Sequence, residues 1–156
     1  MPALSTEAIE RFLARPLVAR IATAGPTVRP VWYLWEDGAF WILTGPWSRL
    51  PEHVRRDPAV AIVVDVCDLA TGEAVQVIAK GRAELLPFDT ARGFRKLSRY
   101  LGTDEAAWDL RFGRYLRDDP EKKGTRWLRV KPASLTGSDL SFAVTKSAEG
   151  DGAEPG

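Results

Sequence analysis

The sequence predicts a mainly β fold with flanking helices, in which about six antiparallel strands close into a barrel. Two observations carry this prediction. Segments rich in β-branched and aromatic residues follow one another across tight turns, and they do not alternate with helices as they would in a doubly wound sheet. The chain has 156 residues, the usual size of one domain, and closing so short a sheet leaves no exposed strand edge.

The first part of the chain predicts one helix and three strands. Ser5 can cap a short amphipathic helix over residues 5–14, which ends before Pro16. After it, β-branched and aromatic residues gather in three segments, which are separated by a Gly-Pro turn and by an Asp-Gly hairpin turn. The three strands are expected over residues 17–23, 27–35 and 39–44.

The rest of the chain predicts three more helices and three more strands. Ser48, Asp89 and Thr103 stand where each helix would begin, and their side chains can accept a hydrogen bond from the first turn. Gly81 lies inside a long strand and predicts a β-bulge or a close approach of another backbone there. The helices are expected over residues 48–56, 89–100 and 103–116, and the strands over 59–66, 74–86 and 126–130.

No linker or internal repeat divides the chain, so residues 1–144 are expected to form one domain. Residues 145–156 are small, polar or charged without an apolar pattern, and they predict a disordered tail. The N-terminal segment lacks the features of a signal peptide, and no apolar run is long enough to span a bilayer. We therefore expect a cytoplasmic protein with no membrane contact.

The charge balance argues against a nucleic-acid partner. Lys and Arg number 22 and Asp and Glu number 21, which gives a net charge of +1, whereas nucleic-acid binders concentrate positive charge. The alternative rests on the helix over 89–100, where a basic face could form from Arg92, Arg95, Lys96 and Arg99. Acidic residues next to that helix oppose this interpretation.

The sequence offers neither a metal centre nor a catalytic motif. The single histidine, His53, and the single cysteine cannot build a zinc site by themselves. Neither a Gly-x-Ser-x-Gly elbow nor a glycine-rich phosphate loop is present. Tyr33 and His53 are the candidates that remain for acid–base chemistry, and no catalytic residue is assigned.

Hydroxyls and arginines next to the third strand do predict an anion site. Thr44, Ser48 and Arg49 surround the turn after that strand, and Arg29 begins the aromatic part of the second strand. The two hydroxyls and the forked guanidinium of Arg49 would together bind a phosphate group. The alternative is that Ser48 only caps the helix and that Arg49 is solvated.

At this point the sequence resembles the pyridoxamine-phosphate-oxidase-like, FMN-binding split-barrel family. Residues 44–49, Thr-Gly-Pro-Trp-Ser-Arg, are similar to the start of the family's Thr-x-x-x-Ser-Arg-Lys segment, and Asp57-Pro58 follows as the family's Asp-Pro does. Gln76 stands five residues before Gly81, as in the family, and residues 129–132 are similar to its closing Arg-x-x-Pro strand. The resemblance covers about residues 8–142.

The resemblance implies a six-stranded antiparallel split β-barrel, with FMN in a groove between the two subunits of a homodimer. The implied function is an oxidoreductase that acts on a small organic substrate by hydride transfer, since flavins carry that chemistry themselves. Trp35, Trp41 and Trp47 would fill the barrel or the interface, or lie near the flavin ring. The implied cofactor contacts are Arg29, Trp32, Thr44, Ser48, Arg49, Gln76 and Arg129.

Two departures from the family pattern narrow the function. Leu50 replaces the lysine and removes one phosphate charge, and no Glu-Phe-Trp-Gln-Gly segment is present, so oxidation of vitamin B6 is not expected. The chain looks closer to the branch that includes deazaflavin F420-dependent reductases. The alternative function is a non-catalytic flavin or haem carrier on the same barrel. The longer anionic tail of F420 could bind Arg55, Arg56, Lys80 and Arg82.

Overall fold

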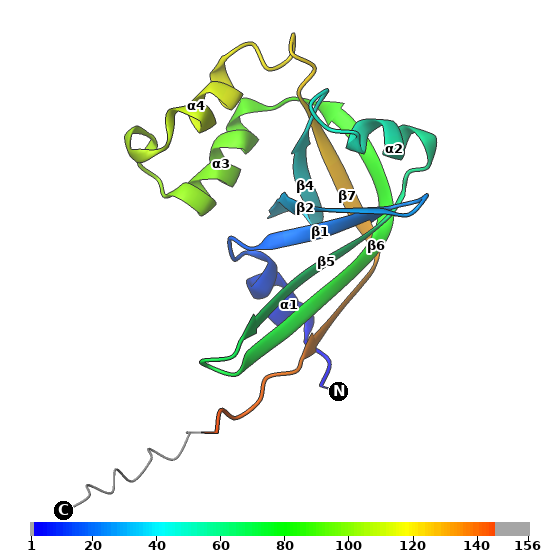
Figure 1. Cartoon of the computed structure of the whole chain (residues 1–156), viewed down its shortest axis with the longest axis vertical. Helices are drawn as coiled ribbons and strands as arrows, with labels where there is room; N and C mark the ends of the chain where they lie inside the picture. Colours follow the sequence, from blue (N-terminus) through cyan, green and yellow to red (C-terminus); the bar gives the residue numbers. More distant parts are fainter. Residues whose placement is uncertain (1, 146–156) are drawn as a thin grey trace, which may run out of the picture.

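The computed structural model describes residues 2–145, which form a curled antiparallel sheet flanked by helices (Figure 1). The strand order is β2-β1-β5-β6-β7-β4-β3. Apart from residue 145, the predicted disordered tail lies outside the described residues. The strands are β1 (Val18–Thr23), β2 (Thr27–Trp32), β3 (Leu34–Glu36), β4 (Ala39–Thr44), β5 (Ala59–Asp68), β6 (Glu73–Pro87) and β7 (Arg126–Asp139).

The sheet curls because its two edge strands are neighbours in the sequence. The predicted strand over 27–35 is interrupted at Tyr33, so β2 and β3 become opposite edges of the sheet. A chain that crosses from one edge to the other through one residue bends the sheet round on itself, as in a barrel. The predicted mainly β barrel with flanking helices is confirmed, with seven strands in the described residues in place of six.

The joint at Tyr33 is held by a side chain from a helix, α3 (Thr90–Leu101). The Tyr33 N–H donates to the hydroxyl of Tyr100 at 3.0 Å, and that hydroxyl donates to the Leu17 carbonyl at 2.7 Å. Tyr33 itself is fully buried. Because buried backbone groups need partners, the Tyr100 hydroxyl takes over the pairing that the ladder loses at the joint.

Replacing Tyr100 with Phe is expected to lower the free energy of unfolding by about 1–3 kcal/mol, because the N–H of buried Tyr33 and the carbonyl of half-buried Leu17 lose their partner. Urea unfolding measures this change. Tyr115→Phe is the matched control, since Tyr115 is 48% exposed and its hydroxyl makes no hydrogen bond within the described residues. If both variants unfold like the natural protein, the hydroxyl of Tyr100 does not stabilise the joint.

The first and third helices begin as predicted, whereas the second begins later than predicted and the last is divided. Ser5 caps the first helix and Asp89 caps the third, as expected. The predicted helix over 103–116 is two elements, which begin at Asp104 and Asp109 and not at Thr103, because these aspartates accept the N–H groups of the first turns. The remaining helices are α1 (Thr6–Leu13), α2 (Leu50–Arg56), the 3₁₀ turn η1 (Glu105–Ala107) and α4 (Leu110–Arg117).

The last strand is much longer than predicted. It was expected to end before Lys131-Pro132, yet β7 continues to Asp139. Pro132 lies opposite Gly81, where the β6–β7 register shifts, so its missing N–H falls at an irregularity in the ladder. A Cβ on Gly81 would lie 2.8 Å from the Lys131 carbonyl oxygen. The predicted bulge at Gly81 is therefore confirmed, and it is what lets the proline stay within the strand.

Two hydrophobic cores lie on the two faces of the sheet. The inner core fills the barrel and includes residues of α1 and α2, such as Leu13 and Leu50. The second core lies between the sheet and the α3–α4 pair, which sit together on one side (Figure 1), and it contains Trp41 and Trp127. None of the helices in this part of the chain has the length and apolar character that crossing a bilayer requires. The cytoplasmic location stays a prediction.

Candidate anion and cofactor site

A cavity of about 500 Å³ opens where β4 ends and α2 begins. We call it the arginine cavity, because its wall contains three arginines and one carboxylate. The arginines are Arg49, Arg55 and Arg126, and the carboxylate is Glu52. Within residues 2–145, none of these three guanidinium groups makes an ion pair. The cavity therefore suits a ligand with net negative charge. Its wall consists of Gly45, Pro46, Trp47, Ser48, Arg49, Pro51, Glu52, Arg55, Gly124 and Arg126.

Strand pairing and one glycine shape this wall. Thr44 at the end of β4 pairs with Arg126 at the start of β7, so the ladder delivers Arg126 to the turn that carries Arg49. Gly124 has a φ of +77°, and a Cβ there would lie 2.9 Å from Cγ of Pro46. A glycine at this position lets the segment before β7 approach the turn after β4.

The hydroxyl of Ser48 links β2 to the arginine cavity. Arg29 donates from Nη1 to Ser48 Oγ at 2.8 Å, and the Leu50 N–H donates to the same oxygen at 3.1 Å. Arg49, and not Ser48, is the capping position of α2, so the predicted cap is displaced by one residue. Thr44 is 1% exposed, and its Oγ1 has no hydrogen-bond partner among the described residues.

Of the seven predicted cofactor contacts, Ser48 and Arg49 line the cavity. Arg29 is joined to it through Ser48, and Thr44 ends the strand that precedes the turn. The other three predicted contacts lie elsewhere. Trp32 stacks on Tyr100, with ring centroids 4.3 Å apart, and packs against the second core. Arg129 pairs with Glu84 at 2.9 Å, next to the ring of Trp41. Gln76 lies on the outer face of the barrel, opposite Asp65 in β5.

The cavity is positively charged even though Leu50 stands in place of the family's lysine. Leu50, which replaces a lysine in the family pattern, is 2% exposed and packs in the barrel core. Arg55 and Arg126 supply cations to the wall in its place. Arg126 could not be predicted as a site residue, because its only signal in the sequence is a position at the start of the last predicted strand. The partner of that strand could not be read from the sequence.

The two candidates for acid–base chemistry do not lie at the cavity. Burial raises the pKa of Tyr33 far above its ordinary value, and its hydroxyl donates to the Arg15 carbonyl at 3.4 Å. His53 lies on α2 outside the cavity wall. Across residues 2–145, no group of three His, Cys, Asp or Glu side chains could hold a metal ion. No side chain is therefore assigned to proton transfer.

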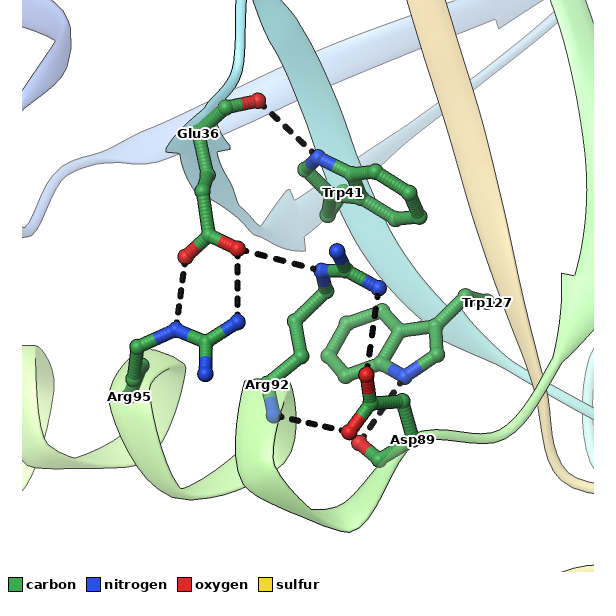
Figure 2. Close-up of polar contacts among 6 residues, drawn as sticks. All are labelled: Glu36, Trp41, Asp89, Arg92, Arg95 and Trp127. Atoms are coloured by element: carbon green, nitrogen blue, oxygen red, sulfur yellow. Dashed lines mark hydrogen bonds and ion pairs between the residues drawn. The ribbon is translucent and has the colours of Figure 1, made fainter.

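The arginines of α3 have partners within the chain. Arg95 makes two hydrogen bonds to the Glu36 carboxylate, at 2.6 and 2.7 Å, and Arg92 lies 3.4 Å from the same group (Figure 2). The guanidinium of Arg92 also lies 3.5 Å from the centroid of the Trp41 ring. Arg99 donates to three carbonyls at the end of α1, and Lys96 is buried. These side chains fasten α3 to the barrel, and this does not favour the nucleic-acid alternative.

The residues around the cavity fall within a match to a known family. The family model described as pyridoxamine 5'-phosphate oxidase matches residues 5–138. The chain belongs to the pyridoxamine 5'-phosphate oxidase family. The match spans β1 to β6, β7 up to residue 138, and the turn at residues 44–49. Among curated proteins, no significant match is found.

Solved structures share the fold of this family member. A conserved hypothetical protein from Mycobacterium tuberculosis aligns with a TM-score of 0.71 at 21% identity, over 93% of this chain and 94% of that chain. A FAD-binding protein from Mesorhizobium loti aligns with a TM-score of 0.61 at 23% identity, over 88% and 95%. A flavocytochrome from Azotobacter vinelandii gives 0.65 at 16% identity, over 93% and 72%. At these identities, the likeness establishes the fold.

Proposed function

We propose that this protein binds FMN with the phosphate in the arginine cavity, and that it is an oxidoreductase acting on a small organic substrate. One observation carries the proposal: Arg49, Arg55 and Arg126, which have no carboxylate partners in the described chain, line one cavity beside the family's Thr-x-x-x-Ser-Arg turn. Two of the similar folds belong to a FAD-binding protein and a flavocytochrome, which supports a flavin cofactor.

The hydroxyls at the cavity fit a phosphate as well as the arginines do. Ser48 Oγ already accepts two hydrogen bonds, from Arg29 and from the Leu50 N–H, so its own proton is free to be donated to an anion. Thr44 Oγ1 is buried without a partner and is a second donor at the base of the turn. A phosphate carries up to two negative charges, which the three arginines would neutralise.

The choice between FMN and F420 follows from where the cations lie. Of the four cations that the sequence analysis assigned to the tail of F420, Arg55 lies on the cavity wall and Arg56, Lys80 and Arg82 do not. This distribution favours the short FMN phosphate over a long polyanionic tail. A bound flavin supplies hydride transfer itself. The role of this chain is to bind the phosphate, to orient the ring and to exclude water.

We also propose that the protein is a homodimer formed through the outer face of β1, β5 and β6. Small or apolar side chains lie next to one another on this face, since Ala22 pairs with Ala61, and Val63 with Ile78. Val28, beside Ala22, is 69% exposed. Arg20, opposite Val63, and Lys80, opposite Ala61, lie on the same face, so the apolar side chains stand among charged ones. Exposed apolar side chains in such a setting favour a protein partner, and the proposed partner is a second copy of the chain.

The position of Gln76 supports the same dimer. Gln76 lies on this outer face, whereas the far end of β6, at Pro87, pairs with Arg126 of the arginine cavity. The two positions are separated by roughly 35 Å of strand, at about 3.3 Å per residue. Gln76 does not line the arginine cavity of its own copy. We propose that it contacts the cofactor, as the family pattern implies, in a groove shared with a partner subunit.

Titration of the apoprotein with FMN and, separately, with F420 tests the proposed cofactor. Tryptophan fluorescence is a suitable readout because Trp47, on the cavity wall, is 57% exposed. We expect FMN to bind more tightly than F420, so that quenching of this fluorescence reaches its half-point at a lower concentration of FMN. Failure of both to bind contradicts the proposal. Turnover is then tested by reducing bound FMN and measuring its reoxidation with a substrate panel; reoxidation by oxygen alone would favour a carrier.

Ile78→Glu is expected to convert the dimer into a monomer, because it places a charge among the apolar side chains of the outer face. Light scattering at micromolar protein concentration measures the mass. Leu110→Glu is the matched control, since Leu110 is 77% exposed on α4, away from this face. A natural protein that is already monomeric, or an Ile78→Glu variant that stays dimeric, would overturn this interface.

A further inference from the structure

A second hollow, of about 330 Å³, lies on the other side of Trp47. It shares Trp47 with the arginine cavity, so this indole ring is a common wall between the two. The segment before β7 also borders both, through Gly124 on one side and Thr125 on the other. The hollow is otherwise lined by Arg111, Arg114, Tyr115, Asp118, Pro120 and Lys123.

Two exposed aromatic rings face this hollow. Trp47 is 57% exposed and Tyr115 is 48% exposed, and their ring centroids lie 6.4 Å apart at an interplanar angle of 46°. By contrast, Trp41, Trp108 and Trp127 are buried in the second core. Exposed aromatic rings that meet at a hollow form a stacking surface for a flat ligand.

The indole ring of Trp47 packs on the backbone beneath it. A Cβ on Gly45 would lie 2.3 Å from the ring, so a side chain at residue 45 would displace the ring from this place. The glycine therefore lets Trp47 lie between the two hollows.

The charge around the two rings is positive. The wall of the hollow contains three cations and one acid. The cations are Arg111, Arg114 and Lys123, and the acid is Asp118. Lys123 pairs with Asp118 at 2.8 Å, and Arg111 pairs with Asp109 at 3.1 Å. Arg114 makes no ion pair with any residue that the structure describes. It is thus left to bind a negative charge on a ligand that lies against Tyr115.

We propose that the hollow between Trp47 and Tyr115 binds a planar aromatic ring that carries a negative charge. Its volume is at the lower end of ligand pockets, which range over roughly 300–1,000 Å³, so it holds one ring system and not a whole flavin. The ligand is either the second nucleotide of a dinucleotide whose flavin phosphate lies in the arginine cavity, or a separate aromatic acid that serves as substrate. The proposal rests on the proposed function for the neighbouring cavity, and it has a binding test of its own.

Calorimetric titration of the apoprotein with four probes tests the hollow. AMP carries a ring and a phosphate, 1-naphthoate a ring and a carboxylate, ribose 5-phosphate a phosphate without a ring, and FMN the proposed cofactor. We expect AMP and 1-naphthoate to bind, and Tyr115→Ala to weaken both by about tenfold, the scale of one stacking contact. Tyr115→Phe should bind as tightly as the natural protein, and the affinities for FMN and ribose 5-phosphate should not depend on residue 115.

Two further titrations distinguish the sources of the ring. In the first, the affinities for FAD and FMN are compared. If FAD binds more tightly than FMN and Tyr115→Ala abolishes this difference, the ring is the second nucleotide of a dinucleotide. Binding of 1-naphthoate to FMN-loaded protein identifies a separate aromatic acid. The inference is overturned if neither AMP nor 1-naphthoate binds, if Tyr115→Ala leaves their affinities unchanged, or if it weakens FMN equally, which would place the flavin ring in the hollow. If FMN does not bind while AMP binds in a Tyr115-dependent way, the proposed function fails and this inference stands.

Discussion

Replacing Arg49 and Arg126 together with alanine is expected to weaken FMN binding by roughly 100-fold or more, since each charged hydrogen bond contributes about 1.5–3 kcal/mol. Both guanidinium groups lie on the wall of the arginine cavity, and neither makes an ion pair within residues 2–145. Removing them leaves the phosphate with Arg55 as the one remaining cation of the wall. The measurement is a fluorescence titration with FMN for both single variants and the double variant.

The controls for this result separate a specific site from general charge. Arg11→Ala removes an exposed arginine on α1, away from the cavity, and should leave FMN affinity unchanged. Raising the ionic strength should weaken binding to the natural protein more than to the double variant, because salt screens the charges that the variant has lost. A double variant that binds FMN as tightly as Arg11→Ala would rule out the arginine cavity as the phosphate site.

Replacing Lys96 with methionine is expected to stabilise the protein by up to about 3 kcal/mol at pH 7. Lys96 is 6% exposed in the second core, its ammonium lies 5.8 Å from the centroid of the Trp127 ring, and no ion pair to it exists in the described structure. Burial lowers the pKa of its side chain from 10.5 to about 8. A shift of this size corresponds to about 3 kcal/mol of destabilisation of the charged form. Methionine keeps the length of the side chain without the charge.

The same residue gives the natural protein a distinct pH dependence. Between about pH 8 and 10.5 the unfolded chain holds a proton on Lys96 that the folded chain has released, so the free energy of unfolding rises with pH across this window. Below pH 8 both states are protonated and the full destabilisation remains. The raised pKa values of Tyr33 and Tyr100 act in the opposite direction at higher pH, and they are common to both proteins.

Urea unfolding of the natural protein and of Lys96→Met between pH 6 and 11 measures the effect of Lys96 as a difference. We expect the difference to be largest below pH 8 and to shrink towards pH 10.5. Lys122→Met is the control, since Lys122 is 84% exposed, and its curve should follow that of the natural protein. Parallel curves for Lys96→Met and the natural protein would show that Lys96 reaches solvent in the folded state.

Local signals in the sequence were enough to predict most of the helices and strands. The caps at Ser5 and Asp89 and the bulge at Gly81 depend on neighbouring residues, and all three are found in the structure. The break at Tyr33 could not be predicted in this way, because it results from closure of the sheet and from the Tyr100 hydroxyl of a distant helix. The continuation of β7 through Pro132 likewise depends on the strand that lies opposite it.

The residues of the candidate site likewise fall into those that a local sequence pattern predicts and those that it does not. Thr44, Ser48 and Arg49 lie within one short string of residues, and the structure places all three at one turn. Arg126 reaches that turn only through the pairing of β4 with β7, which no local pattern reveals. Nor does residue type show which face of a strand an aromatic or charged side chain occupies. Trp32 and Arg129 therefore have partners near the second core, which could not be predicted from their positions in the family pattern.

A crystal structure of the protein with bound FMN would test most directly the claim that the arginine cavity binds the flavin phosphate. The arrangement of unpaired guanidinium groups predicts that the phosphate lies within hydrogen-bond distance of Arg49 and Arg126, with Ser48 Oγ as a further donor. The Arg49→Ala, Arg126→Ala variant, soaked under the same conditions, should show no density for the phosphate at that place. A phosphate bound elsewhere on the barrel, with the arginine cavity filled by solvent, would contradict the proposed function.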